Sequence, residues 1–327
     1  MISLVVLIGL ALIFNFLNGL RDSSTIVATI ISSRAMSPRL ALGMAAAAEF
    51  LGPFIFGVAV ARTIGRGIVE PQVISPGIVL AALLSTILWT LLSWRFGIPS
   101  SSSHALVGGL IGAVTAGVGI QAILVQGITK VIIALFLSPI LGFGLGFLVT
   151  RLVYFLARDA SLRINRFFKT AQIATGLALA LGYGANDGQK SIGMICLSLV
   201  VTGVFKTFEI PVWVIVLSGL VMAVGTTIGE WRLIRTLGAR FYKIRPVDGF
   251  CTQASSAAVI LTAALFGGPV STTQVISTGI LGVGCAERAS KIRWQVMGNI
   301  LGAWVLTIPT TFVIAYGAYW LVSLALK

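Results

Sequence analysis

Apolar runs close to 20 residues long recur along the whole chain. A helix of about 20 residues crosses the roughly 30 Å hydrocarbon core of a bilayer. Of the 327 residues, 57% are apolar and only 10% are charged, whereas a soluble domain carries about 25% charged residues. The runs are continuous rather than alternating in polarity, which argues against a β-barrel. The pattern predicts an all-α polytopic membrane protein.

We expect about ten membrane crossings. Two of the apolar runs are too long for a simple helix, and each contains a charged phrase: GLRDSST at 19–25 and GANDGQKSIG at 184–193. We expect both runs to be broken or re-entrant at these phrases. The predicted cores are 2–32, 40–61, 77–95, 101–119, 124–149, 171–202, 211–228, 251–266, 270–284 and 297–322.

The short connections between the runs alternate between basic and nearly neutral. Lys and Arg collect on cytoplasmic loops of membrane proteins, which explains the net charge of +14 without a nucleic-acid partner. The bias predicts a multi-pass protein of the cell (inner) membrane with both termini outside. The basic residues then left on the outer side are Arg62, Arg66, Lys130, Lys206 and Lys327.

The two halves of the chain carry the same motifs in the same order. Asp22 precedes GIPSSSSHALVGGLIG at 97–112, and Asp187 precedes GGPVSTTQVISTGILG at 267–282. Five predicted spans per half is an odd number, so the second half would enter the membrane from the opposite face. We expect two inverted-topology repeats, 1–150 and 171–327, joined by a basic cytoplasmic linker at 151–170. Secondary transporters have this architecture, with sites at the midplane between the repeats.

Each late motif has a proline followed by hydroxyl residues, which is a signal for the start of a helix. A helix that begins inside the membrane directs free N–H groups and the positive end of its dipole into the protein, and hydroxyls add further donors. The alternative is that the hydroxyls only bond back to their own helices. Because the motif occurs twice at matching places, we favour anion binding by Ser101, Ser102, Ser103, Ser271, Thr272 and Thr273.

Three acidic residues stand within the apolar runs: Asp22, Asp187 and Glu49. A charge at the bilayer centre costs about 3 kcal/mol on insertion scales, so such residues usually serve a function. The alternative is structural pairing of Asp22 with Arg21 and of Asp187 with Lys190. Near an anion, acids are useful if they hold accompanying cations or protons, or accept hydrogen bonds from a protonated oxyanion. Phosphate carries such a proton near neutral pH and sulfate does not.

These phrases resemble the PiT family of inorganic phosphate transporters, which also includes sulfate permeases. The resemblance rests on NGLRDSSTIVATIISSRAM, GIPSSSSHALVGG, YGANDGQKSIGMI and GGPVSTTQVISTGILGVG, with support from RPVDGFCTQASSAAVIL and WQVMGNILGAWVLTIP. It implies phosphate import driven by Na⁺ or H⁺, or transport as a metal–phosphate complex. It also implies phosphate between the two Ser/Thr phrases, and a cation side formed by Asp22, Asn186 and Asp187.

Four residues depart from the family pattern: Arg21 and Thr25 stand where Asn is common, Lys190 takes the later position of the second phrase, and Gln274 replaces a His. Lys and Arg offer only hydrogen-bond donors and cannot ligate a cation. Arg21 and Lys190 would therefore put fixed positive charge where Na⁺ would sit. We expect coupling to H⁺ rather than Na⁺, or uptake of a neutral metal–phosphate complex, and no resident cofactor.

Three other interpretations stay open at this point: a sulfate permease, a passive anion channel, and a membrane enzyme using His104 beside the serines. The broken spans argue against a channel. Neighbouring residues at one helix start do not face each other, and no Gly-x-Ser-x-Gly elbow occurs, so we expect no enzyme. The expected partners are phosphate or sulfate and the lipid bilayer, with a homodimer as an open alternative. The single His and three scattered Cys residues predict no metal site.

Overall fold

The computed structural model describes residues 4–98, 100–161, 163–230, 245–288 and 294–325, and this part of the chain is helical without a strand. Two π turns, Thr63–Gly67 and Gly184–Gly188, and two 3-10 turns, Pro71–Val73 and Ile120–Ala122, interrupt the α-helices. The α-helices are α1 (Leu4–Ser32), α2 (Pro38–Phe56), α3 (Ala59–Arg62), α4 (Pro76–Phe96), α5 (Ser102–Gly117), α6 (Val125–Leu156), α7 (Ile164–Tyr183), α8 (Gln189–Val201), α9 (Val212–Ile228), α11 (Pro246–Leu265), α12 (Thr272–Arg288) and α13 (Trp294–Ala325).

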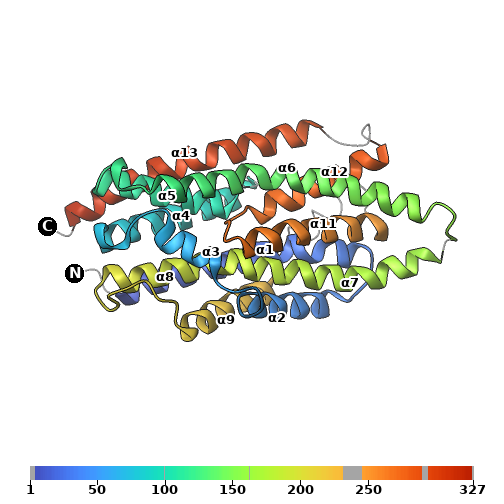
Figure 1. Cartoon of the computed structure of the whole chain (residues 1–327), viewed down its shortest axis with the longest axis horizontal. Helices are drawn as coiled ribbons and strands as arrows, with labels where there is room; N and C mark the ends of the chain where they lie inside the picture. Colours follow the sequence, from blue (N-terminus) through green and yellow to red (C-terminus); the bar gives the residue numbers. More distant parts are fainter. Residues whose placement is uncertain (1–3, 99, 162, 231–244, 289–293, 326–327) are drawn as a thin grey trace.

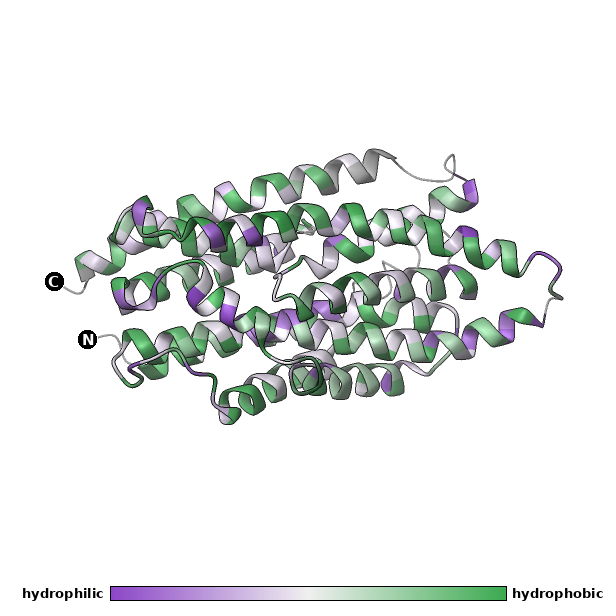
Figure 2. Cartoon of the chain, viewed as in Figure 1, coloured by the Kyte–Doolittle hydropathy of each residue, from purple (hydrophilic) through white to green (hydrophobic). Residues whose placement is uncertain are grey.

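The helices lie roughly along one long axis (Figure 1). Five of them, α1, α2, α4, α6 and α13, are long and apolar enough to cross a membrane. Large apolar side chains such as Ile140, Leu148 and Leu306 are exposed, and green hydrophobic stretches cover much of the long helices (Figure 2). In water such surface would be unfavourable, whereas in a bilayer it faces lipid tails. The prediction of an all-α polytopic membrane protein is confirmed.

The start of α1 and the end of α13 lie at the same end of the molecule, and the connection from α6 to α7 lies at the opposite end (Figure 1). This arrangement agrees with both termini being on one side of the membrane. Which side that is stays a prediction. Most of the predicted linker 151–170 is helical, because α6 continues to Leu156 and α7 begins at Ile164. The domain boundaries also stay predictions.

Four of the predicted crossings form two helical hairpins, α4–α5 and α11–α12, which occupy opposite halves of the long axis (Figure 1). Both turns have the same construction. Gly97 and Gly267 adopt left-handed φ angles of 66° and 68°. The next amide, of Ile98 or Gly268, donates back to Ser93 O or Ala263 O, at 2.8 Å in each case. This is the Schellman pattern that ends a helix and reverses the chain.

The turns of both hairpins are buried, since Ser100, Ser101, Val270 and Ser271 are at most 3% exposed. Each hairpin therefore turns inside the protein rather than at a membrane surface, whereas the sequence predicts its two helices as separate crossings. Ten separate crossings are not confirmed, and the inverted repeat stays a prediction. Pro99 and the basic residues Arg232, Arg235, Arg240, Lys243, Lys291, Arg293 and Lys327 lie outside the described residues.

The first charged phrase does not break its helix, contrary to the prediction. α1 runs without interruption through residues 19–25. The hydroxyls of Ser23, Ser24 and Thr25 donate to carbonyls three residues earlier, at 2.6, 2.7 and 2.8 Å. These local bonds keep the polar side chains within the helix instead of opening it. Gly19 serves close packing rather than unwinding, because a Cβ there would lie 2.2 Å from Met222 O of α9.

The second charged phrase forms the π turn Gly184–Gly188 between α7 and α8. π turns inside helices often occur at functional sites. Helix α2 crosses this turn so closely that a Cβ on Gly184 would lie 2.0 Å from Glu49 O. Only glycine allows this approach, which brings Glu49 close to the phrase that carries Asn186 and Asp187. The predicted break or re-entrance in this run is therefore wrong, because the helix continues from α7 into α8 through a π turn.

Candidate functional site

The centre of the site is Asp187, a fully buried acid on the π turn. One carboxylate oxygen forms an ion pair with Lys190, whose side chain is also fully buried. The other accepts a hydrogen bond of 2.5 Å from Thr272 Oγ1, at the start of α12. Asp187 thus joins the second charged phrase to a hydroxyl of the second hairpin turn. Because Asp187 is fully buried, its charge requires these partners.

Asn186 holds the same hairpin turn through the backbone. Its Nδ2 donates to Gly268 O at 3.0 Å, and its Oδ1 accepts from Val270 N at 3.2 Å. Ser103 Oγ, from the first hairpin, donates to Val270 O at 2.6 Å. The two hairpin turns therefore meet directly, and Asn186 fixes the position of one of them.

Ser101 and Ser271 cap the two helices that follow the turns. Ser101 Oγ accepts from the backbone N–H of His104 at 3.2 Å and lies 2.9 Å from His104 Nδ1. Ser271 Oγ accepts from Gln274 N at 3.4 Å. These bonds stay within α5 and α12, which agrees with the alternative that the hydroxyls bond only to their own helices. Ser102 and Thr273 are half-buried, and neither side chain has a hydrogen bond within the described part of the chain.

Asp22 is 6% exposed and faces the same centre from α1. It interacts electrostatically with Asp187, Lys190 and Arg21. Its Oδ2 atom is buried and has no hydrogen-bond partner among the described residues. Arg21 is half-buried and donates from Nη2 to Ser100 O of the first hairpin turn at 3.4 Å. The first charged phrase thus touches the first turn as the second phrase touches the second.

Glu49 of α2 is 1% exposed and interacts electrostatically with Asp22 and Asp187. Its Oε2 accepts a hydrogen bond from Thr226 Oγ1 of α9, while its Oε1 is buried and has no partner among the described residues. Thr226 also lies 3.1 Å from Gly19 O. Three buried acids and two basic side chains therefore surround the meeting point of the hairpins. All twelve residues expected at the site lie on α1, α2, the π turn, α8 or the two hairpins.

Several residues that contact this centre were not predicted. The fully buried Tyr183 places its hydroxyl 2.8 Å from Thr25 Oγ1 and interacts with Asp22 and Asp187. Gln189 Nε2 donates to Gly57 O, directly after α2, and to Ala185 O in the π turn, at 2.6 Å each, which stabilises both segments. Both residues stand next to or inside the second charged phrase. Their position as polar residues at a charged phrase inside an apolar run is the sequence signal that could have identified them.

Among the described residues, no group of three or more His, Cys, Asp or Glu side chains is arranged to hold a metal ion. Asp187 already shares its oxygens with Lys190 and Thr272. In the described part of this centre, the unpartnered acid oxygens are Asp22 Oδ2 and Glu49 Oε1. Those two atoms are the positions where a proton or a cation can be added with the least rearrangement of the contacts described above.

A family model described as "Phosphate transporter family" matches residues 18–315. The chain belongs to the phosphate transporter family. Two similar relatives, from Rhizobium meliloti and Bacillus subtilis, are both described as "Probable low-affinity inorganic phosphate transporter". The first is 40% identical over 98% of this chain and 97% of its own length, and the second is 38% identical over 99% and 98%. These relatives are named as transporters, which agrees with the expectation that the chain is not an enzyme.

A solved structure described as "The sodium-dependent phosphate transporter" superposes on this chain with a TM-score of 0.88. It is 25% identical and the match covers 99% of this chain and 100% of the other. The recognition of the family from the four sequence phrases is therefore confirmed. Because that neighbour is described as sodium-dependent, the choice between H⁺ and Na⁺ stays open for this chain.

Proposed function

We propose that this chain imports inorganic phosphate across the cell membrane by symport. Family membership and the names of its relatives support phosphate as the substrate. The observation that carries the proposal is the contact between Asp187 and Thr272, with Lys190 paired to the same acid. This contact links a charged group directly to a hydroxyl of the expected anion cradle, as coupling requires.

Phosphate would bind between the two hairpin turns. Ser102 and Thr273 lie on the first turns of α5 and α12, and their hydroxyls have no partner in the described chain, so they can donate to an anion without breaking an existing bond. Thr272 and Ser103 would complete the cradle by exchanging their present acceptors for phosphate oxygens, and Ser101 and Ser271, which accept bonds from backbone N–H groups, would donate their hydroxyl hydrogens. The N-terminal ends of both helices add partial positive charge to the same space.

Asp22, Asp187 and Glu49, with Asn186, would form the coupling side, with Arg21 and Lys190 setting the charge. Three acids against two bases leave the centre negative, so an entering dianion requires added positive charge. Lys190 already occupies one oxygen of Asp187, which removes a ligand that Na⁺ would need. Among the described atoms, Asp22 Oδ2 and Glu49 Oε1 are the free positions for protons. These contacts support H⁺ rather than Na⁺ as the driving ion.

The test is uptake of labelled phosphate into proteoliposomes with an imposed pH gradient and no sodium. We expect accumulation under the pH gradient alone and little effect of added Na⁺. Uptake that appears only with a Na⁺ gradient would overturn the proposed coupling ion. Uptake that requires a divalent cation would identify a metal–phosphate complex as the substrate, and stronger uptake of sulfate than of phosphate would overturn the substrate.

A further inference from the structure

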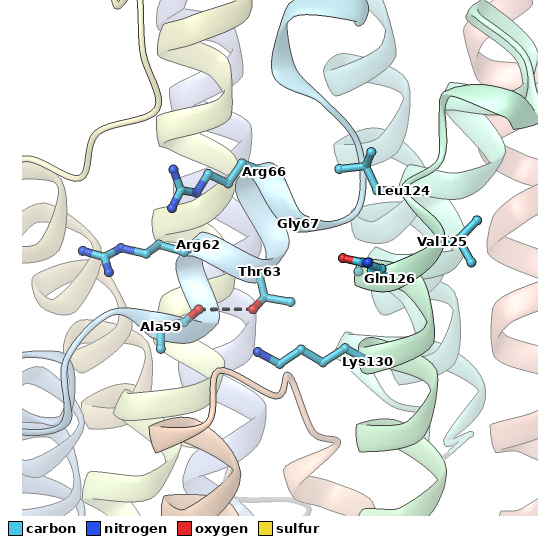
Figure 3. Close-up of a pocket in the computed structure, with 10 residues that line it drawn as sticks. Ala59, Arg62, Thr63, Arg66, Gly67, Leu124, Val125, Gln126 and Lys130 are labelled. Carbon is cyan, nitrogen blue, oxygen red and sulfur yellow. Dashed lines mark hydrogen bonds between the residues drawn. The ribbon is translucent and has the colours of Figure 1, made fainter.

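A cavity of about 640 Å³ lies apart from the site, between the α3 segment and the start of α6. Three basic residues line it: Arg62, Arg66 and Lys130. We call these three the basic pocket. Figure 3 shows Arg62 of α3 and Arg66 of the following π turn both extending away from α6, and Lys130 extending from α6 toward Thr63. Among the described residues, no acid lines this cavity and none of the three basic residues has an ion pair.

Lys130 also lines a second cavity of about 360 Å³, a groove between α6 and α11. The lining of this groove is almost entirely apolar, with Leu137, Leu141 and Phe266 exposed by 45%, 45% and 75%. It extends along α6 from Lys130 to Leu145. A rise of 1.5 Å per residue gives a length of roughly 22 Å, which is enough to hold an acyl chain through one leaflet of a bilayer whose core is about 30 Å thick.

We propose that an anionic phospholipid binds here, with its headgroup phosphate in the basic pocket and an acyl chain in the α6–α11 groove. Three cations without an ion pair in the described chain complement a phosphodiester, and they adjoin the groove through the shared residue Lys130. A free phosphate ion would use the basic pocket alone and would leave the apolar groove without a matching ligand. The combination of charge and apolar surface is what selects a lipid.

The bound lipid would touch the hairpin that carries half of the transport site. Gly268 and Val270, the residues whose backbone atoms bond to Asn186, line this groove. Next to Gly268, Gly267 O accepts a hydrogen bond of 2.7 Å from Thr63, which lies in the wall of the basic pocket. The α11–α12 turn is therefore in contact with both parts of the proposed lipid site.

The experiment titrates the purified protein in detergent with phosphatidylglycerol and follows its thermal unfolding midpoint, with phosphatidylcholine as the matched neutral lipid. We expect a saturable rise with phosphatidylglycerol that phosphatidylcholine does not reproduce. Each basic residue near an anionic headgroup contributes about fivefold to affinity, so the double variant Arg66→Gln/Lys130→Gln should lower affinity about 25-fold. Lys206→Gln, an exposed basic residue outside both cavities, is the control and should leave the titration unchanged.

A second variant separates a lipid from a soluble anion. Ala258→Trp fills the groove from an exposed position on α11 and leaves the three cations in place. It should abolish the response to phosphatidylglycerol. If Ala258→Trp responds like the parent protein, if phosphatidylcholine acts as well as phosphatidylglycerol, or if the double variant keeps full affinity, the proposal is wrong. A response to glycerol phosphate that matches phosphatidylglycerol and depends on the basic pocket would identify a site for soluble phosphates instead.

Discussion

The two charged phrases are alike in the sequence but differ in how their acids are held. Asp187 has a partner for each oxygen, Lys190 and Thr272. Asp22 has a buried oxygen without a partner among the described residues, although it faces the same centre. The second phrase is a closed network that holds its hairpin turn, whereas the first has an acid free to change its charge. We infer that Asp187 mainly organises the site and Asp22 mainly titrates.

The largest expected effect is on stability. Asp187→Asn would leave the fully buried Lys190 without its ion-pair partner, and breaking such a pair lowers the free energy of unfolding by about 3–5 kcal/mol. We expect a large drop in the thermal unfolding midpoint and loss of uptake. The double variant Asp187→Asn/Lys190→Met removes the unpaired charge and should recover most of the midpoint. If the single variant is as stable as the parent protein, Lys190 has another partner and the closed network is wrong.

The hydroxyl residues of the two hairpins should differ in how their removal affects stability and phosphate affinity. Thr272→Ala removes a bond to a charged group worth about 1.5–3 kcal/mol, so it should lower both the unfolding midpoint and the apparent affinity for phosphate, the latter about tenfold or more. Ser102→Ala removes a hydroxyl without a partner in the described chain and should lower affinity with little change in the midpoint. Unchanged affinity in both variants and in their combination would remove the hydroxyl phrases from the anion site.

The smallest effect concerns the hydrogen bond between Thr25 in the first charged phrase and Tyr183, which directly precedes the second. Tyr183→Phe removes the hydroxyl that lies 2.8 Å from Thr25 Oγ1. The ring stays in place, so we expect a loss of only about 0.5–1.5 kcal/mol in the free energy of unfolding. Uptake should continue. Thr25→Val, which keeps the shape of the partner, should have a similar effect and should add nothing when combined with Tyr183→Phe. Full additivity in that cycle would show that the two hydroxyls do not interact.

The sequence predicted the helical membrane class and the residues that meet at the centre, because charges in apolar runs and prolines before hydroxyls are local signals. It did not predict that α1 stays intact, because Ser23, Ser24 and Thr25 can either open a helix or bond back to it, and only packing decides. The buried hairpin turns also escaped prediction, since a short polar turn between apolar runs looks the same at a membrane surface. The contact between Glu49 and Thr226 joins residues far apart in the chain and leaves no local signal.

The most direct test of the difference between the two acids is phosphate transport by Asp22→Asn. Asn keeps the size of the side chain and removes its charge, and no bond to Oδ2 from the described residues is lost, so the variant should fold with an unchanged unfolding midpoint. In proteoliposomes we expect it to exchange labelled for unlabelled phosphate but to fail to accumulate phosphate under a pH gradient. Accumulation equal to that of the parent protein would show that Asp22 is structural and would contradict the account.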